Sequence, residues 1–182
     1  VAESYIAAKE SGTEPAIRQH FLGAVVYETR PPVTGDVTRH EVIDGQQRMT
    51  TLQLLLDAVQ QVIDERGHED LAEALEGLIL NKQKAFIDQR ERFKLWPSQA
   101  DRLAFAAAMD PAAPSDCEHR ILDAHKFFRR EATRWLSGEP DADGDVPPST
   151  EGLRVEPLTS PPQDRLILVA LDLTGQDDAQ LI

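Results

Sequence analysis

The strongest pattern in the sequence is an apolar stripe with helical spacing that starts at Gln46. Apolar side chains recur every three or four residues from there until Gly67. A period of 3.6 residues is typical of an amphipathic helix with one buried face, so we predict one helix across this stretch. The same spacing, with weaker contrast, predicts three further helices over residues 68–80, 98–110 and 116–136. A large helical part is therefore expected.

Four short segments have the composition of β-strands. Residues 21–27 and 39–43 contain β-branched and aromatic side chains and flank a loop with proline and glycine, which predicts a hairpin with a long connection. Residues 92–96 are predicted to be extended. Residues 166–173 form a continuous apolar run, which is typical of a central strand. The predicted fold is α+β, with a small mixed β-sheet and a large helical insertion.

Length and composition fit a single domain. The 182 residues, 41% of them hydrophobic, suffice for one core. We expect residues 1–138 and 164–182 to form this domain. Residues 139–163 are acidic and rich in proline, which predicts a linker or a disordered insertion. Because the chain starts at Val1 and stops within a helix-like start, we expect a fragment of a larger protein.

No stretch of the sequence approaches the roughly 20 apolar residues that a membrane span requires. The single cysteine, Cys117, cannot form an intramolecular disulfide, and no signal-like segment opens the chain. These features favour a cytoplasmic protein without a membrane partner.

The charge balance limits how the chain could contact nucleic acid. With 32 acidic and 19 basic residues the net charge is −13, which excludes a global positive field. DNA contact must therefore be local. Arg90, Arg92 and Lys94 alternate, so a strand would place all three on one face as a DNA-binding candidate. The alternative is a solvated surface beside neighbouring acids.

A turn between a predicted strand and a predicted helix is the best candidate for chemistry. Gly45 permits a sharp turn, and the helix after it presents unpaired backbone N–H groups that suit a phosphate or another anion. Arg48 can donate to phosphate, and Asp44 can bind a metal or accept a proton. The candidate residues are Asp44, Gly45, Gln46, Gln47, Arg48, Thr50 and Thr51. The alternative is an ordinary turn and helix start.

Two blocks of this region resemble a known family. Residues 20–26 (HFLGAVV) and 41–52 (EVIDGQQRMTTL) resemble the signature of GmrSD-type restriction proteins, domain-of-unknown-function family 262. Weaker matches lie at residues 94–101 and 166–173. The resemblance implies a fold of the ParB/sulfiredoxin-like type. It also implies hydrolysis of a nucleoside triphosphate (GTP, ATP or UTP) with Mg²⁺, in the restriction of modified DNA during anti-phage defence.

Carried onto this sequence, the resemblance assigns roles to single residues. It implies catalytic roles for Asp44, Gln46, Gln47 and Arg48, nucleotide binding by Gly45, Arg48, Thr50 and Thr51, and a metal at Asp44. The chain is also similar to phosphorothioate-sensing Ssp-type proteins. That similarity implies modified double-stranded DNA as a partner and an HNH-type nuclease, either as a carboxy-terminal domain or as a partner subunit. A homodimer stays open.

The sequence leaves two other functions open. The turn could bind modified DNA or a nucleotide without hydrolysis, or residues 98–138 could form a helical interaction scaffold. His119 and His125, near Asp116 and Cys117, lack the paired spacing of a zinc module, so a helix surface or core packing is the favoured interpretation. Trp96 and Trp135 could stack on bases, but aromatic side chains at such spacings usually fill a core.

Overall fold

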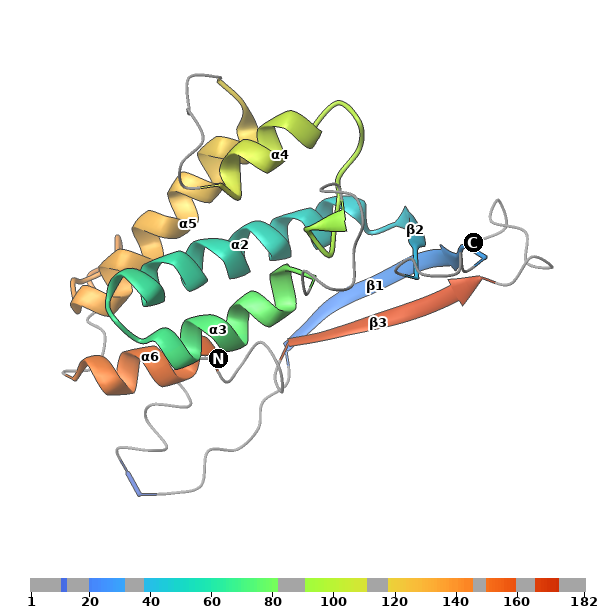
Figure 1. Cartoon of the computed structure of the whole chain (residues 1–182). Helices are drawn as coiled ribbons and strands as arrows, with labels where there is room; N and C mark the ends of the chain where they lie inside the picture. Colours follow the sequence, from blue (N-terminus) through green and yellow to red (C-terminus); the bar gives the residue numbers. More distant parts are fainter. Residues whose placement is uncertain are drawn as a thin grey trace.

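The computed structural model describes residues 11–12, 20–31, 38–81, 91–110, 118–145, 150–159 and 166–173, and the statements below refer to these. The fold is α+β, as predicted (Figure 1). The elements in chain order are β1 (His20–Thr29), β2 (His40–Asp44), α2 (Gln46–Glu65), α3 (Glu69–Ile79), α4 (Arg102–Ala108), α5 (Arg120–Ser137), α6 (Glu151–Thr159) and β3 (Leu166–Leu173). Five helices thus lie between the second and third strands, which confirms the predicted helical insertion. The ParB/sulfiredoxin-like assignment stays a prediction.

The described strands form one small mixed sheet in the order β2-β1-β3. Strand β1 pairs with β2 in the antiparallel sense and with β3 in the parallel sense. The predicted hairpin is therefore confirmed. The predicted central position of residues 166–173 is wrong, because β1 is the central strand and β3 lies at an edge. Val169 and Leu171 of β3 are exposed, so its apolar run does not reflect burial on both faces.

The predicted strand over residues 92–96 is also wrong. In this segment only Phe93 pairs, through a single antiparallel bridge to Leu80. The Phe93 side chain is buried and belongs to the helical core, where its ring lies 5.7 Å from that of Phe105. The segment is thus held by core packing around one aromatic ring, and it forms no strand of the sheet.

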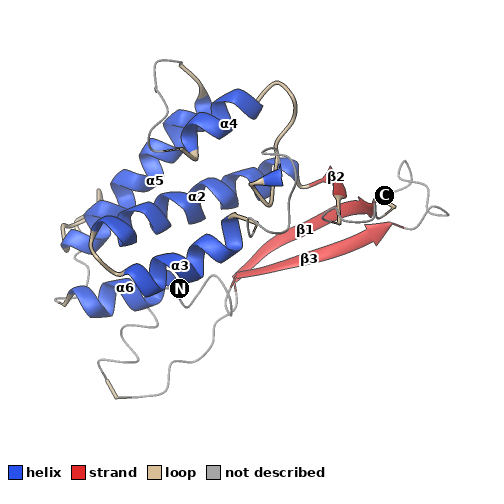
Figure 2. Cartoon of the chain, in the orientation of Figure 1, coloured by secondary structure: helices blue, strands red, loops and turns tan. Residues whose placement is uncertain are grey.

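The main core lies within the helical part. Helix α2 packs against both α3 and α5, and the largest fully buried side chains include Ile63, Leu75, Phe105 and Leu136. In β1, Val25 and Val26 are also buried, but neither belongs to this core cluster. Figure 2 shows the sheet extending from one end of the helical part. Helix α2 connects the two regions, because it starts beside the sheet and continues into the core.

Within residues 139–163, the predicted linker or disordered insertion, residues 151–159 form α6. Three of its described residues, Arg154, Val155 and Pro157, are buried. The Arg154 Nε donates to the Leu136 carbonyl oxygen at 2.9 Å, and the Trp135 indole donates to the Arg154 carbonyl oxygen at 2.9 Å. These contacts attach α6 to the end of α5. They also confirm the packing interpretation of Trp135.

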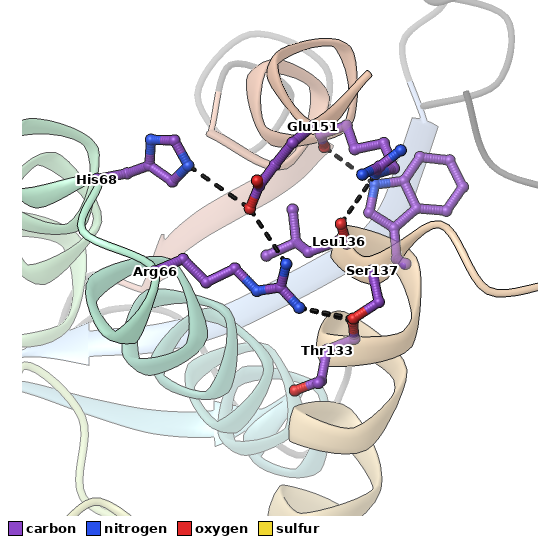
Figure 3. Close-up of polar contacts among 8 residues, drawn as sticks. Arg66, His68, Thr133, Leu136, Ser137 and Glu151 are labelled. Atoms are coloured by element: carbon purple, nitrogen blue, oxygen red, sulfur yellow. Dashed lines mark hydrogen bonds and ion pairs between the residues drawn. The ribbon is translucent and has the colours of Figure 1, made fainter. Parts of the chain in front are cut away.

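Arg66, directly after α2, joins the ends of three helices (Figure 3). Its guanidinium donates to the Glu151 carboxylate at 3.1 Å and to the Ser137 hydroxyl at 2.6 Å. A longer bond of 3.4 Å reaches the Thr133 carbonyl oxygen. The carboxy-terminal ends of α2 and α5 are therefore fixed to the start of α6. This arrangement leaves the other end of α2, which holds the candidate turn, beside the sheet.

Candidate functional site

The turn between β2 and α2 has the predicted geometry of a helix start. Gly45 lies in the left-handed region, with φ of 90° and ψ of 10°, and no side chain caps the helix there. The first bond within the helix runs from the Met49 amide to the Gly45 carbonyl oxygen at 3.0 Å. The amides of Gln46, Gln47 and Arg48 therefore precede the first possible intrahelical donor. Such a helix end is a general anion-binding feature.

The Arg48 side chain lies across β1, where two glycines make room for it. Its Nη1 donates to the Ala24 carbonyl oxygen. A Cβ atom added at Gly23 would lie 2.9 Å from the Arg48 Cζ, and one added at Gly45 would lie 3.2 Å from the Arg48 Nη1. Gly23 also has a positive φ of 108° and lies where the pairing of β1 with β3 is irregular. Gly23 thus makes room for the Arg48 guanidinium, while a Cβ at Gly45 would first meet the Val25 Cγ2 at 3.0 Å and would lie equally close to the Ala24 carbonyl oxygen and to Arg48.

Gly23 is a site residue that the sequence analysis did not identify. The available signal was a glycine inside a strand, which often marks a close approach of another group to the backbone. The sequence does not indicate which group approaches, because Arg48 lies 25 positions further along the chain.

The side chains of the motif divide between two sides of the helix start. Gln46 and Thr50 line a cleft, together with Met49 between them. The Gln46 Nε2 donates to the Val42 carbonyl oxygen at 2.7 Å, and the Thr50 hydroxyl donates to the Gln46 carbonyl oxygen at 2.9 Å. Arg48 does not line the cleft. The motif therefore has a cationic side chain over β1 and uncharged side chains toward the cleft.

The other predicted site residues lie at the surface of the same turn. Asp44 is the last residue of β2, pairs with Val26 of β1 and is exposed. Gln47 and Thr51 are also exposed on the first turns of α2. The fold thus gathers the predicted residues in one accessible region, but Thr50 and Thr51 do not share one environment.

The cleft has a volume of about 1320 Å³ and is bounded by the sheet, α2, α4 and residues 91–99. The sheet contributes Val25, Tyr27, Leu168 and Ala170. The Tyr27 ring contacts the His40 ring edge-on, with centroids 4.8 Å apart. The cleft therefore joins the helix start to an apolar and aromatic surface.

The basic stretch does not form the predicted row. Arg90 lies outside the described residues, and no strand forms to place Arg92 and Lys94 on a common face. The Arg92 guanidinium lies over the Phe93 ring at 5.4 Å, and the Lys94 ammonium donates to the Gly77 carbonyl oxygen. The strand argument for a DNA-binding face is therefore wrong, while DNA contact by these cations stays a prediction.

A separate polar network is buried between α2 and α5. The His125 Nε2 lies 2.7 Å from the Asp57 Oδ2, which also accepts from the Gln61 side chain at 2.7 Å. Arg129 donates to Gln61 and, at 2.7 Å, to Glu65. Burial raises the pKa of Asp57, although the hydrogen bond with His125 opposes this shift.

This network supports the packing interpretation of His125. Asp116 and Cys117, its suggested companions, lie outside the described residues. Within the described ranges, no three His, Cys, Asp or Glu side chains are grouped as metal ligands. The same ranges hold no helix that is both long and apolar enough to cross a membrane.

Comparison with known families identifies the chain at the family level. The family described as "GmrSD restriction endonuclease, N-terminal domain" matches residues 4–169. No curated protein matches the chain. The family match covers the candidate turn, the helical insertion and the first half of β3, and it confirms the resemblance drawn from the sequence. DNA and a nuclease domain are thus the partners of the family. The chain belongs to the GmrSD family of restriction endonucleases, whose N-terminal domain it matches.

Proposed function

We propose that the β2–α2 turn binds and hydrolyses a nucleoside triphosphate, and that this reaction serves the sensing of modified DNA in restriction. The phosphates would bind at the amides of Gln46, Gln47 and Arg48. The helix dipole and the N–H groups both favour negative charge at that position.

The observation that supports this proposal best is the space around Arg48. Two glycines with positive φ, Gly23 and Gly45, permit the guanidinium to lie against β1. Its bond to the Ala24 carbonyl oxygen uses one of five N–H donors and fixes the orientation of the plane. The remaining donors suit a phosphate, because a guanidinium can form two parallel bonds with its oxygens.

Asp44 and Gln47 complete the proposed site. Mg²⁺ usually binds proteins through one or two carboxylates together with substrate phosphates. Asp44 fits this mode, because it is an exposed carboxylate one residue before the anion-binding turn. Bound with the triphosphate, Mg²⁺ would neutralise phosphate charge. Asp44 would hold the metal, and the carboxamide of Gln47 would orient the attacking water.

In the complete restriction protein, we propose that hydrolysis couples the recognition of modified double-stranded DNA to an HNH-type nuclease. The nuclease would be a carboxy-terminal domain or a partner subunit. A phosphorothioate is one candidate modification, Arg92 and Lys94 are candidate DNA contacts, and a homodimer is one candidate assembly.

The test measures GTP, ATP and UTP hydrolysis by the complete restriction protein, with and without modified DNA. We expect Asp44→Ala and Arg48→Ala each to lower kcat by about 100-fold or more, the loss typical of removing one charge-stabilising group. Arg130→Ala is the matched control, because this arginine is exposed on α5 and pairs with its neighbour Glu131 at 3.2 Å. Unchanged turnover in both turn variants would contradict the assignment.

The alternative is a module that binds nucleotide or modified DNA without hydrolysis. Its signature in the same experiment is tight nucleotide binding by the wild-type protein with no product. In that case Arg48→Ala would weaken binding, and the hydrolytic part of the proposal would be wrong.

A further inference from the structure

We infer that the cleft beside Gln46 receives a nucleobase with its sugar. This inference rests on the proposed function, because it gives the phosphates to the helix start and the base to the cleft. Nothing in the family description assigns a ligand to the cleft.

The cleft lies beside the first turn of α2. Gln46, Met49 and Thr50 are spaced as neighbours on one face of a helix, and all three line the cleft. The amides that would bind phosphate belong to the same first turn. A ligand with an anionic end at these amides therefore has its other end directed to the cleft or to the Arg48 side. Of these two sides, as far as the described residues show, the cleft is the one with a mainly apolar surface.

The charges around the cleft are partly compensated by one another. Arg39 pairs with Glu91, and Arg30 pairs with Glu41. Arg30 and Arg39 are thus paired with carboxylates, whereas Lys94 and Arg102, which also line the cleft, donate to backbone carbonyl oxygens. Most of the cleft surface is apolar, so it suits the uncharged part of a nucleotide, and the unpaired amides of α2 suit the phosphates.

The walls of the cleft suit a planar ring. The Trp96 side chain lines the cleft and contacts the Phe93 ring edge-on, with centroids 5.2 Å apart. Phe105, which is fully buried, lies 6.0 Å from Trp96 on the core side. Core packing thus fixes the orientation of the indole. Base stacking on aromatic side chains is a general mode of nucleotide binding.

Gln46 adds a directed polar group to this surface. Because its Nε2 donates to the Val42 carbonyl oxygen, its Oε1 is oriented as an acceptor. Such an acceptor fits the exocyclic amine or ring N–H of a base. The volume of about 1320 Å³ exceeds the roughly 300–1,000 Å³ of typical ligand pockets, which leaves space for the sugar as well.

The test uses substitutions in β3 whose larger side chains fill the cleft. Ala170 lines the cleft and is exposed, whereas the next residue, Leu171, points to the opposite face of β3 and is 44% exposed. Ala170→Leu and Ala170→Phe therefore form a graded series that removes no core contact. Leu171→Phe is the matched control. Calorimetry on the complete restriction protein measures Kd for a nucleoside triphosphate, for inorganic triphosphate and for a modified DNA duplex.

We expect the wild-type protein to bind the nucleoside triphosphate more tightly than inorganic triphosphate. Ala170→Phe should raise the Kd of the nucleotide about tenfold or more, the scale of one lost stacking contact. Ala170→Leu should have a smaller effect in the same direction. Inorganic triphosphate should bind equally to all variants. If Ala170→Phe weakens only DNA binding, the base in the cleft comes from DNA and the inference holds with that source.

Two results separate failure of this inference from failure of the proposed function. In the first, Ala170→Phe changes neither nucleotide nor DNA binding, while Arg48→Ala weakens the binding of both the nucleoside triphosphate and inorganic triphosphate. The cleft inference is then overturned and the phosphate site stands. If the wild-type protein binds no triphosphate and Ala170→Phe leaves DNA binding unchanged, both are overturned. Thermal melting checks that the variants are folded.

Discussion

The helical part and the three-stranded sheet differ in how far they bury apolar side chains. In the helices, Leu75 and Phe105 are 0% exposed. On the sheet, Phe21 is 62% exposed and Leu171 is 44% exposed. Since stability comes chiefly from apolar area removed from water, the helical part supplies most of it. The sheet instead supplies a surface and a backbone against which the turn is held.

Helix α2 explains how the two regions cooperate at the candidate site. Its middle and end are buried among α3 and α5, and Arg66 fixes its last turn to α5 and α6. Its first turn lies beside β1, where Arg48 contacts the backbone. The rigid region therefore orients the helix, while the exposed region leaves its amides accessible. A binding site is expected at such a boundary between a stable scaffold and an accessible surface.

The largest expected effect is a difference in the free energy of unfolding between a substitution in the helical core and one on the sheet. Leu75→Ala should lower the free energy of unfolding by about 2–5 kcal/mol, because the surrounding helices cannot fill the cavity. Leu171→Ala should change it by about 0.5 kcal/mol or less, as at most surface positions. Urea unfolding measures both. Similar losses would show that Leu171 is covered in solution and that the two regions do not differ as described.

A second pair of substitutions tests the contact between the regions. Gly23→Ala should destabilise the protein by about 1–3 kcal/mol through its positive φ and should also displace Arg48. Gly67→Ala is the matched control, because Gly67 has a φ of 82° but nothing within 4 Å of an added Cβ. Only Gly23→Ala should weaken nucleotide binding. Equal nucleotide affinity in the two variants would contradict the role of Gly23 in placing Arg48.

The parts of the fold that sequence predicts well depend on local signals. The start of α2 follows from a change of period and from Gly45, both within a few residues. The hairpin follows from two strand-like segments around a loop. Each of these elements occurs where predicted, because no distant contact is needed to define it.

The parts that sequence does not predict depend on distant contacts. Helix α6 contains Pro157 and acidic neighbours, yet Val155 is buried and Arg154 bonds to α5. Phe93 looks like part of a strand, but its ring packs among helical residues. The apolar run of β3 predicts a central strand, although it lies at an edge. The role of Gly23 depends on Arg48, which only the folded chain brings next to it.

Inside the helical part, the buried carboxyl of Asp57 contrasts with exposed acids of the same helix such as Asp64. Burial raises the pKa of Asp57 above its ordinary value of 3.8, against the opposing effects of His125, Arg129 and Arg92. The folded state therefore holds this proton more tightly than the unfolded state. The stability that this tighter proton binding gives the folded state is fully present below pH 3.8, the ordinary pKa of an aspartate. It is lost as the pH rises through the pKa of Asp57 in the folded state.

The variant Asp57→Asn stays neutral and lacks this titration. We compare the free energy of unfolding of the wild type with that of Asp57→Asn. The difference, wild type minus variant, should fall as the pH rises from 3.8 through the folded pKa of Asp57. Urea unfolding across a pH series measures the difference, and Asp64→Asn, at an exposed position of α2, controls for loss of one negative charge. A difference that rises with pH would mean that the pairing of Asp57 with His125 outweighs desolvation. The buried network would then stabilise the α2–α5 contact as an ion pair, and the helical part would depend on charge as well as on apolar packing.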